Sequence, residues 1–154
     1  MRILETEEIT RLSHVFDEAV NQAKLSPCQK SKRGAVVFKD GLILGRGFNA
    51  PPEPFSCDGV FCRPICSQFA IHAEQNAIYD ALLRQNTVKD ASIFHIKVKD
   101  GKSQISNDLS CAECSKLVLR LKLHEFILFQ DQGFVAYEAL EFHELTLAYL
   151  KAKQ

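Results

Sequence analysis

Apolar side chains recur every three or four residues in the first segment of the chain, at Leu12, Val15, Phe16, Ala19, Val20 and Ala23. This spacing predicts an amphipathic helix over residues 6–24, which Ser26-Pro27 ends. Two short apolar runs follow, over residues 35–38 and 42–47, and Asp40-Gly41 joins them. An Asp-Gly pair between apolar runs is typical of a tight hairpin turn. The first third of the chain therefore predicts a helix followed by an antiparallel hairpin.

The rest of the chain alternates between helical and extended patterns. Helices are predicted over residues 72–84, 111–121 and 142–153, and strands over residues 92–98, 126–129 and 134–137. Residues 49–67 hold four prolines and three cysteines, a composition that predicts an ordered loop. A hairpin followed by alternating helices and strands predicts an α/β fold of three layers, α/β/α, with a mixed sheet of about five strands.

Size and charge narrow the class of protein. A chain of 154 residues that is 46% hydrophobic predicts a single domain over residues 1–154. Lys+Arg and Asp+Glu both number 19, so no excess positive charge favours a nucleic-acid partner. The N-terminal segment is charged and no stretch approaches the length of a membrane span, so we expect a cytoplasmic protein without a membrane partner. In a reducing compartment, the six cysteines favour metal ligation over disulfides.

Two short motifs carry the chemistry, His72-Ala73-Glu74 and Cys111-Ala112-Glu113-Cys114. A catalytic zinc takes three protein ligands and leaves a fourth position for water, and His72, Cys111 and Cys114 supply three ligands. Glu74 remains as a free carboxylate that can exchange protons with water and a leaving amine. Cysteines at i and i+3 in a first helical turn lie on one side, where the helix dipole favours their thiolates. Alone, CxxC also fits a structural zinc or a redox pair, but the two motifs together predict a hydrolytic zinc centre.

These motifs, with Gly34-Ala35-Val36-Val37 and Gly47-Phe48-Asn49, resemble the zinc-dependent cytidine and deoxycytidylate deaminase superfamily. The resemblance implies a cytidine deaminase-like fold and one catalytic Zn²⁺. It also implies that the Asn49 amide and backbone groups of Ala73 and Cys111 bind the substrate. Asn49 is alternatively a turn residue before two prolines. Ser110 stands where the family usually has proline, which alters the turn that touches the substrate.

A second group of cysteines is less clearly assigned by the sequence. Cys57, Cys62 and Cys66 lie in the proline-rich loop, and Cys28 precedes the first predicted strand. Four thiolates fit a closed structural zinc site, and some deoxycytidylate deaminases carry a second zinc near the same insertion. A long loop with little apolar content also needs such a cross-link to stay ordered. The alternatives are unpaired buried thiols, or three cysteines with a histidine such as His95.

The resemblance implies hydrolytic deamination of a cytosine-type nucleotide, most directly dCMP to dUMP, because the long insertion before His72 is typical of that branch. A free nucleoside or another aminated pyrimidine is the alternative substrate. A zinc-stabilised binding protein without activity is the other alternative; intact Glu74 argues against it and Ser110 is its only support. Arg63 and Lys30, with Lys32 and Arg33, are candidates for a phosphate site, although a basic cluster is often only a solvated surface. The family commonly assembles as homo-oligomers.

Overall fold

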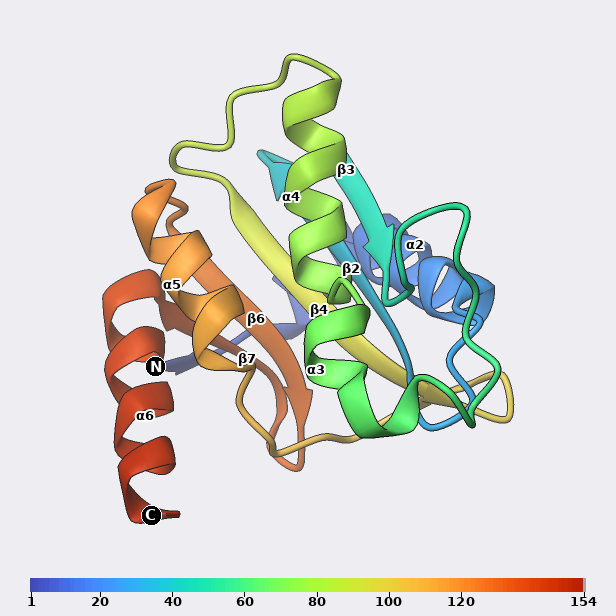
Figure 1. Cartoon of the computed structure of the whole chain (residues 1–154). Coiled ribbons are helices and arrows are strands. Elements are labelled where there is room, and N and C mark those ends of the chain that lie inside the picture. The colour runs from blue at the N-terminus through green and yellow to red at the C-terminus, as the bar shows by residue number, and fades with distance from the viewer. Residues whose placement is uncertain (154) are drawn as a thin grey trace.

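The computed structural model describes residues 1–153, which form one mixed sheet between two layers of helices (Figure 1). The sheet has seven strands in the order β1-β7-β6-β4-β2-β3, with β5 paired to β4. The strands are β1 (Arg2–Ile3), β2 (Lys32–Lys39), β3 (Leu42–Phe48), β4 (Ser92–Lys99), β5 (Lys102–Gln104), β6 (Glu125–Gln130) and β7 (Gly133–Glu138). Strands β4 and β6 pair in parallel, and the other neighbouring strands pair antiparallel. The predicted mixed sheet is confirmed.

Five of these strands, β2, β3, β4, β6 and β7, correspond to the five predicted from the sequence. The remaining two strands, β1 and β5, were not among the predicted strands. Strand β1 has two residues and pairs with β7, while β5 has three residues and pairs with the end of β4. Segments this short show no alternation of apolar and polar residues, so only their pairing partners define them as strands.

The prediction of one helix over residues 6–24 is wrong at Leu12. The chain forms α1 (Thr6–Arg11) and α2 (Ser13–Leu25), and Leu12 between them leaves helical geometry with φ −96° and ψ 7°. Leu12 is buried, whereas α1 has no buried residue. The break therefore lets Leu12 enter the core while α1 remains on the surface.

The two faces of the sheet carry separate layers of helices, as predicted. Helix α2 covers one face, where it packs against alternate residues of β2 such as Val36 and Phe38. The opposite face, with Ala35 and Val37, is covered by α4 (Ala73–Leu83), α5 (Ala112–Arg120) and α6 (Ala139–Ala152). Figure 1 shows α4 and α5 side by side on that face, with α2 behind the sheet. No helix within residues 1–153 is both long and apolar enough to span a bilayer.

Two glycines of β3 bring α4 close to the sheet. A β-carbon on Gly45 or Gly47 would overlap backbone atoms of α4, at Ala77 and Ala73. The predicted loop between β3 and α4 contains a short 3-10 helix η1 (Arg63–Ile65) and helix α3 (Cys66–Phe69). An isolated bridge between Ala50 and Ile71 joins the two ends of this insertion. The first turn of α4 is thereby fixed against the end of β3.

Candidate metal centre and adjoining pocket

Each metal-binding motif lies at the start of a helix. His72 precedes α4 and Cys111 precedes α5, and both have extended backbone angles, with φ −71° and ψ 155° for His72 and φ −69° and ψ 160° for Cys111. The backbone N–H of His72 donates to Gln75 Oε1 at 3.0 Å, which satisfies a donor at the helix start. The two helix starts bring three side chains together.

The three predicted ligands converge on one point. The Nδ1 atom of His72 lies 3.2 Å from Cys111 Sγ and 3.3 Å from Cys114 Sγ, and the two sulfurs are 3.5 Å apart. Zinc bonds of about 2.0–2.3 Å in tetrahedral geometry place ligand atoms roughly 3.3–3.8 Å apart. Within residues 1–153, this is the one group in which three His, Cys, Asp or Glu ligand atoms lie within 4.8 Å of one another.

The charges of the cluster also fit a divalent cation. The hydrogen bond shared with Cys114 lowers the pKa of Cys111 to about 4, against the opposing effect of burial. The same contact with Cys111, together with burial, raises the pKa of Cys114 well above its ordinary value. The hydrogen bond with Cys111 raises the pKa of His72. The protein alone therefore stabilises the thiolate of Cys111 and disfavours that of Cys114. A bound divalent cation would stabilise both thiolates.

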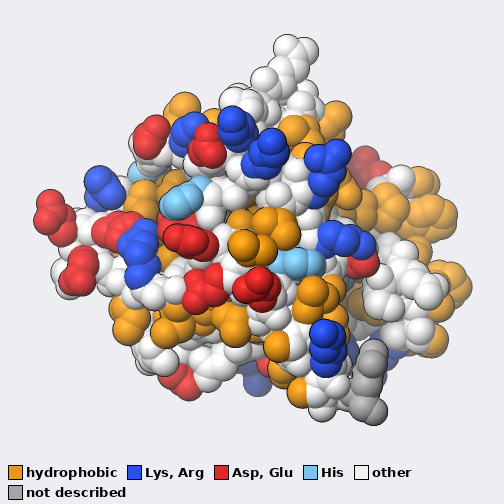
Figure 2. Space-filling model, turned by 90° about the vertical axis from the view of Figure 1, so that its left-hand side faces the viewer, with side chains coloured by type: hydrophobic (Ala, Val, Ile, Leu, Met, Phe, Trp, Pro, Cys, Tyr) orange, Lys and Arg blue, Asp and Glu red, His pale blue; other side chains and the backbone are white. Residues whose placement is uncertain are grey.

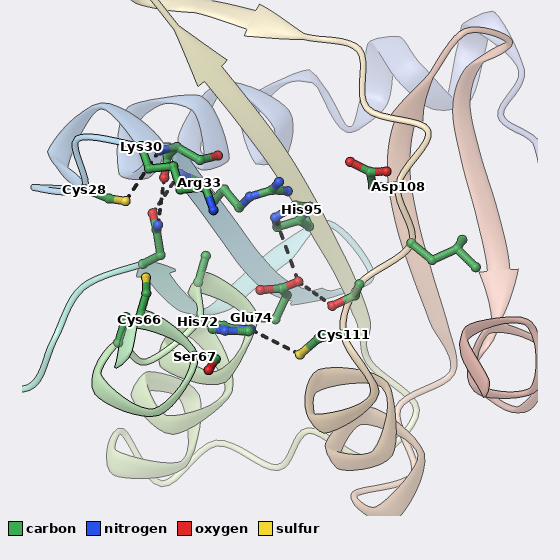
Figure 3. Close-up of a pocket in the computed structure, with 16 residues that line it drawn as sticks. Cys28, Lys30, Arg33, Cys66, Ser67, His72, Glu74, His95, Asp108 and Cys111 are labelled. Atoms are coloured by element: carbon green, nitrogen blue, oxygen red, sulfur yellow. Dashed lines mark hydrogen bonds and ion pairs between the residues drawn. The ribbon is translucent and has the colours of Figure 1, made fainter. Parts of the chain in front are cut away.

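Glu74 lies beside this cluster without joining it. Its side chain is buried, Ser110 Oγ donates to Glu74 Oε1 at 2.6 Å, and His95 Nε2 lies 3.8 Å from the same oxygen (Figure 3). Burial alone would raise the pKa of Glu74, but His95 and the Ser110 hydrogen bond more than offset it, so the pKa lies below the usual value. Burial lowers the pKa of His95 despite the nearby carboxylate. Both directions describe a carboxylate beside a neutral imidazole, and the Ser110 hydrogen bond contributes to stabilising the carboxylate.

These side chains line a cavity of about 370 Å³, a volume within the usual range for small-molecule sites. The lining includes His72, Ala73, Glu74 and Cys111 of the two motifs, and also Lys30, Arg33, Asn49 and His95. Figure 3 shows Arg33 and Lys30 near the start of β2, and Cys111 on another side of the cavity. The pocket thus combines two of the three predicted metal ligands, a free carboxylate and two cationic side chains.

Asn49 lines the pocket, and most of its amide is occupied by the protein. Its Oδ1 accepts from Ser26 Oγ at 2.7 Å and from the Arg33 N–H at 2.8 Å, while Nδ2 donates to the Ser31 carbonyl at 2.8 Å. These bonds tie the end of β3 to the segment before β2. One N–H of the amide is left over for a ligand, so a contact between Asn49 and substrate stays a prediction.

The two predicted phosphate-binding residues differ in which cavities they line. Lys30 lines both the pocket that contains Glu74 and a second cavity of about 340 Å³, whereas Arg63 lines only the second cavity, together with Cys28, Cys57, Cys62 and Cys66. Arg33, and not Arg63, lines the pocket that contains Glu74, and a role in phosphate binding stays a prediction for each of these side chains. The sequence marked Arg33 only as a member of a basic cluster, because nothing local distinguishes it from its neighbours.

The four cysteines of the proposed structural site share that second cavity. Cys57 Sγ and Cys62 Sγ are 3.2 Å apart, and all four thiols are free. His95 does not line this cavity but lies beside Glu74, which argues against the alternative with His95 as fourth ligand. The sequence missed His95 as a pocket residue, because the pairing of His95 on β4 with Ala35 on β2 fixes its place and is not visible locally.

Comparison with known proteins agrees with the fold and the motifs. The sequence profile of the "cytidine and deoxycytidylate deaminase zinc-binding region" matches residues 9–130. The chain belongs to this family, and the predicted family is confirmed. A search of curated proteins finds no significant match.

Several solved structures share the fold. The dCMP deaminase of cyanophage S-TIM5 in apo form has a TM-score of 0.62 and 22% identity, over 84% of this chain and 89% of that one. The same enzyme in complex with dCMP and dUMP has a TM-score of 0.61 and 23% identity, over 81% and 82%. The cytidine deaminase of Burkholderia pseudomallei has a TM-score of 0.58 and 16% identity, over 84% and 94%. The predicted cytidine deaminase-like fold is therefore confirmed.

Proposed function

We propose that the protein catalyses zinc-dependent hydrolytic deamination of a cytosine-type nucleotide, with dCMP converted to dUMP and ammonia released. One observation carries the proposal: a buried carboxylate, Glu74, adjoins a three-ligand metal cluster, two of whose ligands line the same pocket. A carboxylate that is not needed as a ligand has a chemical use in hydrolysis, where it moves protons. The likeness to a dCMP deaminase that binds dCMP and dUMP supports the nucleotide as substrate.

In this proposal His72, Cys111 and Cys114 hold the metal. When bound, zinc lowers the pKa of a water molecule towards neutrality and so supplies the nucleophile. Overall, water adds to the ring carbon that bears the amine, the carbon–nitrogen bond breaks and ammonia leaves. The carboxylate of Glu74 takes one proton from the attacking water and gives it to the ring nitrogen, and it then carries the second proton, from the added hydroxyl, to the leaving amine. Ser110 holds Glu74 Oε1 and so limits the rotation of the carboxylate.

We further propose that Lys30 and Arg33 recognise the 5′-phosphate. Both line the pocket with Glu74, and a guanidinium and an ammonium are suited to charge-assisted hydrogen bonds with phosphate oxygens. Ammonia release from dCMP, deoxycytidine, cytidine, cytosine and adenosine tests the function. We expect the highest kcat/KM for dCMP, with deoxycytidine at least about tenfold lower. Equal rates on dCMP and deoxycytidine would remove phosphate recognition, and turnover confined to another ring would overturn the substrate.

The cysteine cavity supports a second proposal, a structural zinc held by Cys28, Cys57, Cys62 and Cys66. All four side chains line one cavity, and two of the sulfurs are 3.2 Å apart. The hydrogen bond with Cys62 lowers the pKa of Cys57 and raises that of Cys62, so the protein alone again favours one thiolate of a close pair. A cation would stabilise both thiolates and tie the insertion to the segment before β2.

We also propose that residues 1–154 form a single domain and that the protein self-associates. Both core clusters lie against the same sheet, which supports one cooperative unit. Figure 2 shows the side that carries α5 and α6, where hydrophobic side chains lie among charged ones. The exposed apolar residues of α6 are Leu140, Leu145, Leu147, Tyr149 and Leu150. Sedimentation equilibrium tests the assembly: a monomer at micromolar concentration would contradict self-association.

A further inference from the structure

One buried polar side chain in the pocket is not used by the fold. His95 is 5% exposed, and its Nε2 has no hydrogen-bond partner among the described residues. The carboxylate oxygen Oε1 of Glu74 lies 3.8 Å from Nε2, which is longer than a hydrogen bond. The ring lines the same cavity as Glu74, and Figure 3 shows it between Arg33 and Glu74.

The position of His95 in the sheet makes an unpaired imidazole nitrogen unexpected. Along β4, Phe94 and Ile96 belong to the core beneath α2, while Ile93 belongs to the core on the opposite face. His95 shares the face of Ile93, because side chains two residues apart on a strand point the same way. An apolar side chain at this position would pack without leaving a polar atom unpaired. The imidazole therefore lowers the stability of the ligand-free protein. A ligand in the pocket can supply the missing hydrogen-bond partner of Nε2.

We propose that His95 contacts the substrate: its Nε2–H donates a hydrogen bond to an acceptor atom on the edge of the ring that Glu74 protonates. The inference rests on the proposed function, since it takes the ligand to be an aminated pyrimidine. The carboxylate of Glu74 favours the tautomer with hydrogen on Nε2, because the alternative tautomer would turn a lone pair towards Glu74 Oε1. Because His95 Nε2 and Glu74 Oε1 are only 3.8 Å apart in one cavity, a single edge of a bound ring can face both groups.

Two readouts on the zinc-loaded enzyme separate this role from packing. They are the Tm of the ligand-free protein and the Kd for dUMP. His95→Leu removes the unpaired polar atom at similar volume, so we expect an unchanged or higher Tm, a dUMP affinity at least about tenfold weaker and a lower kcat/KM for dCMP. His95→Gln keeps a donor and should recover part of the affinity. The control Ile93→Val, on the same face of β4 but outside the pocket lining, should lower Tm and leave dUMP binding unchanged.

One result would contradict the role of His95, and a different result would contradict the proposed function. A lower Tm for His95→Leu with unchanged dUMP affinity would assign the imidazole to packing and overturn the inference. Failure of the wild type to bind dUMP or to turn over dCMP would overturn the proposed function instead. In that case the melting temperatures still decide the role of His95: a fall in His95→Leu shows that the free fold needs the imidazole, and a rise shows that it does not.

Discussion

Ser110 Oγ donates a 2.6 Å hydrogen bond to Glu74 Oε1 and so joins the turn before α5 to the first turn of α4. Ser110 stands where the family usually has proline, which has no side-chain donor. The change from the family pattern therefore adds a contact to the carboxylate that we assign to proton transfer. A protein without activity would not need a contact that orients this carboxylate. The contact therefore favours an enzyme over a zinc-stabilised binding protein.

Removing that hydroxyl should change the rate and its pH dependence. Ser110→Ala deletes a hydrogen bond to a charged group, for which the typical contribution is about 1.5–3 kcal/mol, so we expect kcat to fall by about tenfold or more. Because the bond helps to lower the pKa of Glu74, its loss should raise that pKa and move the acidic limb of the rate profile to higher pH. Ser110→Thr should restore the wild-type profile. An unchanged profile in Ser110→Ala would show that the bond does not act on catalysis.

Zinc binding at the catalytic site should release protons. At pH 7 the Cys111 thiol, with a pKa of about 4, is already ionised, whereas the pKa of Cys114 is raised and its proton must leave when the metal binds. The raised pKa of His72 adds to this release. We therefore expect at least one proton per zinc, and an affinity that increases with pH through the neutral range. Calorimetry of the metal-free protein in two buffers with different ionisation enthalpies measures the release, and a value of zero would contradict the ligand assignment.

The cysteine cavity should hold a second metal ion. Elemental analysis of the loaded wild type should give close to two zinc per chain, and the double variant Cys57→Ser, Cys62→Ser should retain one. Because a structural zinc contributes folding free energy, the double variant should also have a lower Tm. One zinc per chain in fully loaded wild type would remove the structural site. Retention of turnover by the double variant would show that the two sites are separable.

Phosphate recognition should depend on Arg33 rather than Arg63. Arg33→Ala removes a cationic side chain from the pocket, so KM for dCMP should rise by about tenfold or more while kcat/KM for deoxycytidine stays nearly unchanged. Arg63→Ala is the matched control, since Arg63 lines the other cavity. Equal losses on nucleotide and nucleoside in Arg33→Ala would assign the side chain to general pocket shape. A loss confined to Arg63→Ala would restore the sequence-based assignment.

The parts of the site that the sequence predicts are those fixed by local spacing. Cys111 and Cys114 share one helical turn, and His72 and Glu74 share another, so their order along the chain was enough to anticipate the cluster. Arg33 and His95 depend on the pairing of β2 with β4, which places Arg33 opposite Lys97 and His95 opposite Ala35. Nothing in either strand alone reveals that register. The helix break at Leu12 also depends on tertiary structure, because burial of Leu12 outweighs the helical period around it.

The central claim is that Glu74 moves protons in a zinc-dependent deamination without holding the metal. Its most direct test is the rate of ammonia release from dCMP by the wild type and by Glu74→Gln at equal zinc content. We expect Glu74→Gln to keep its catalytic zinc and its Tm while kcat falls by about 10²- to 10⁴-fold, the typical contribution of a positioned proton-transfer group. Cys114→Ser, by comparison, should lose zinc and activity together. Substantial turnover by zinc-loaded Glu74→Gln would contradict the account, because another group would then carry the protons.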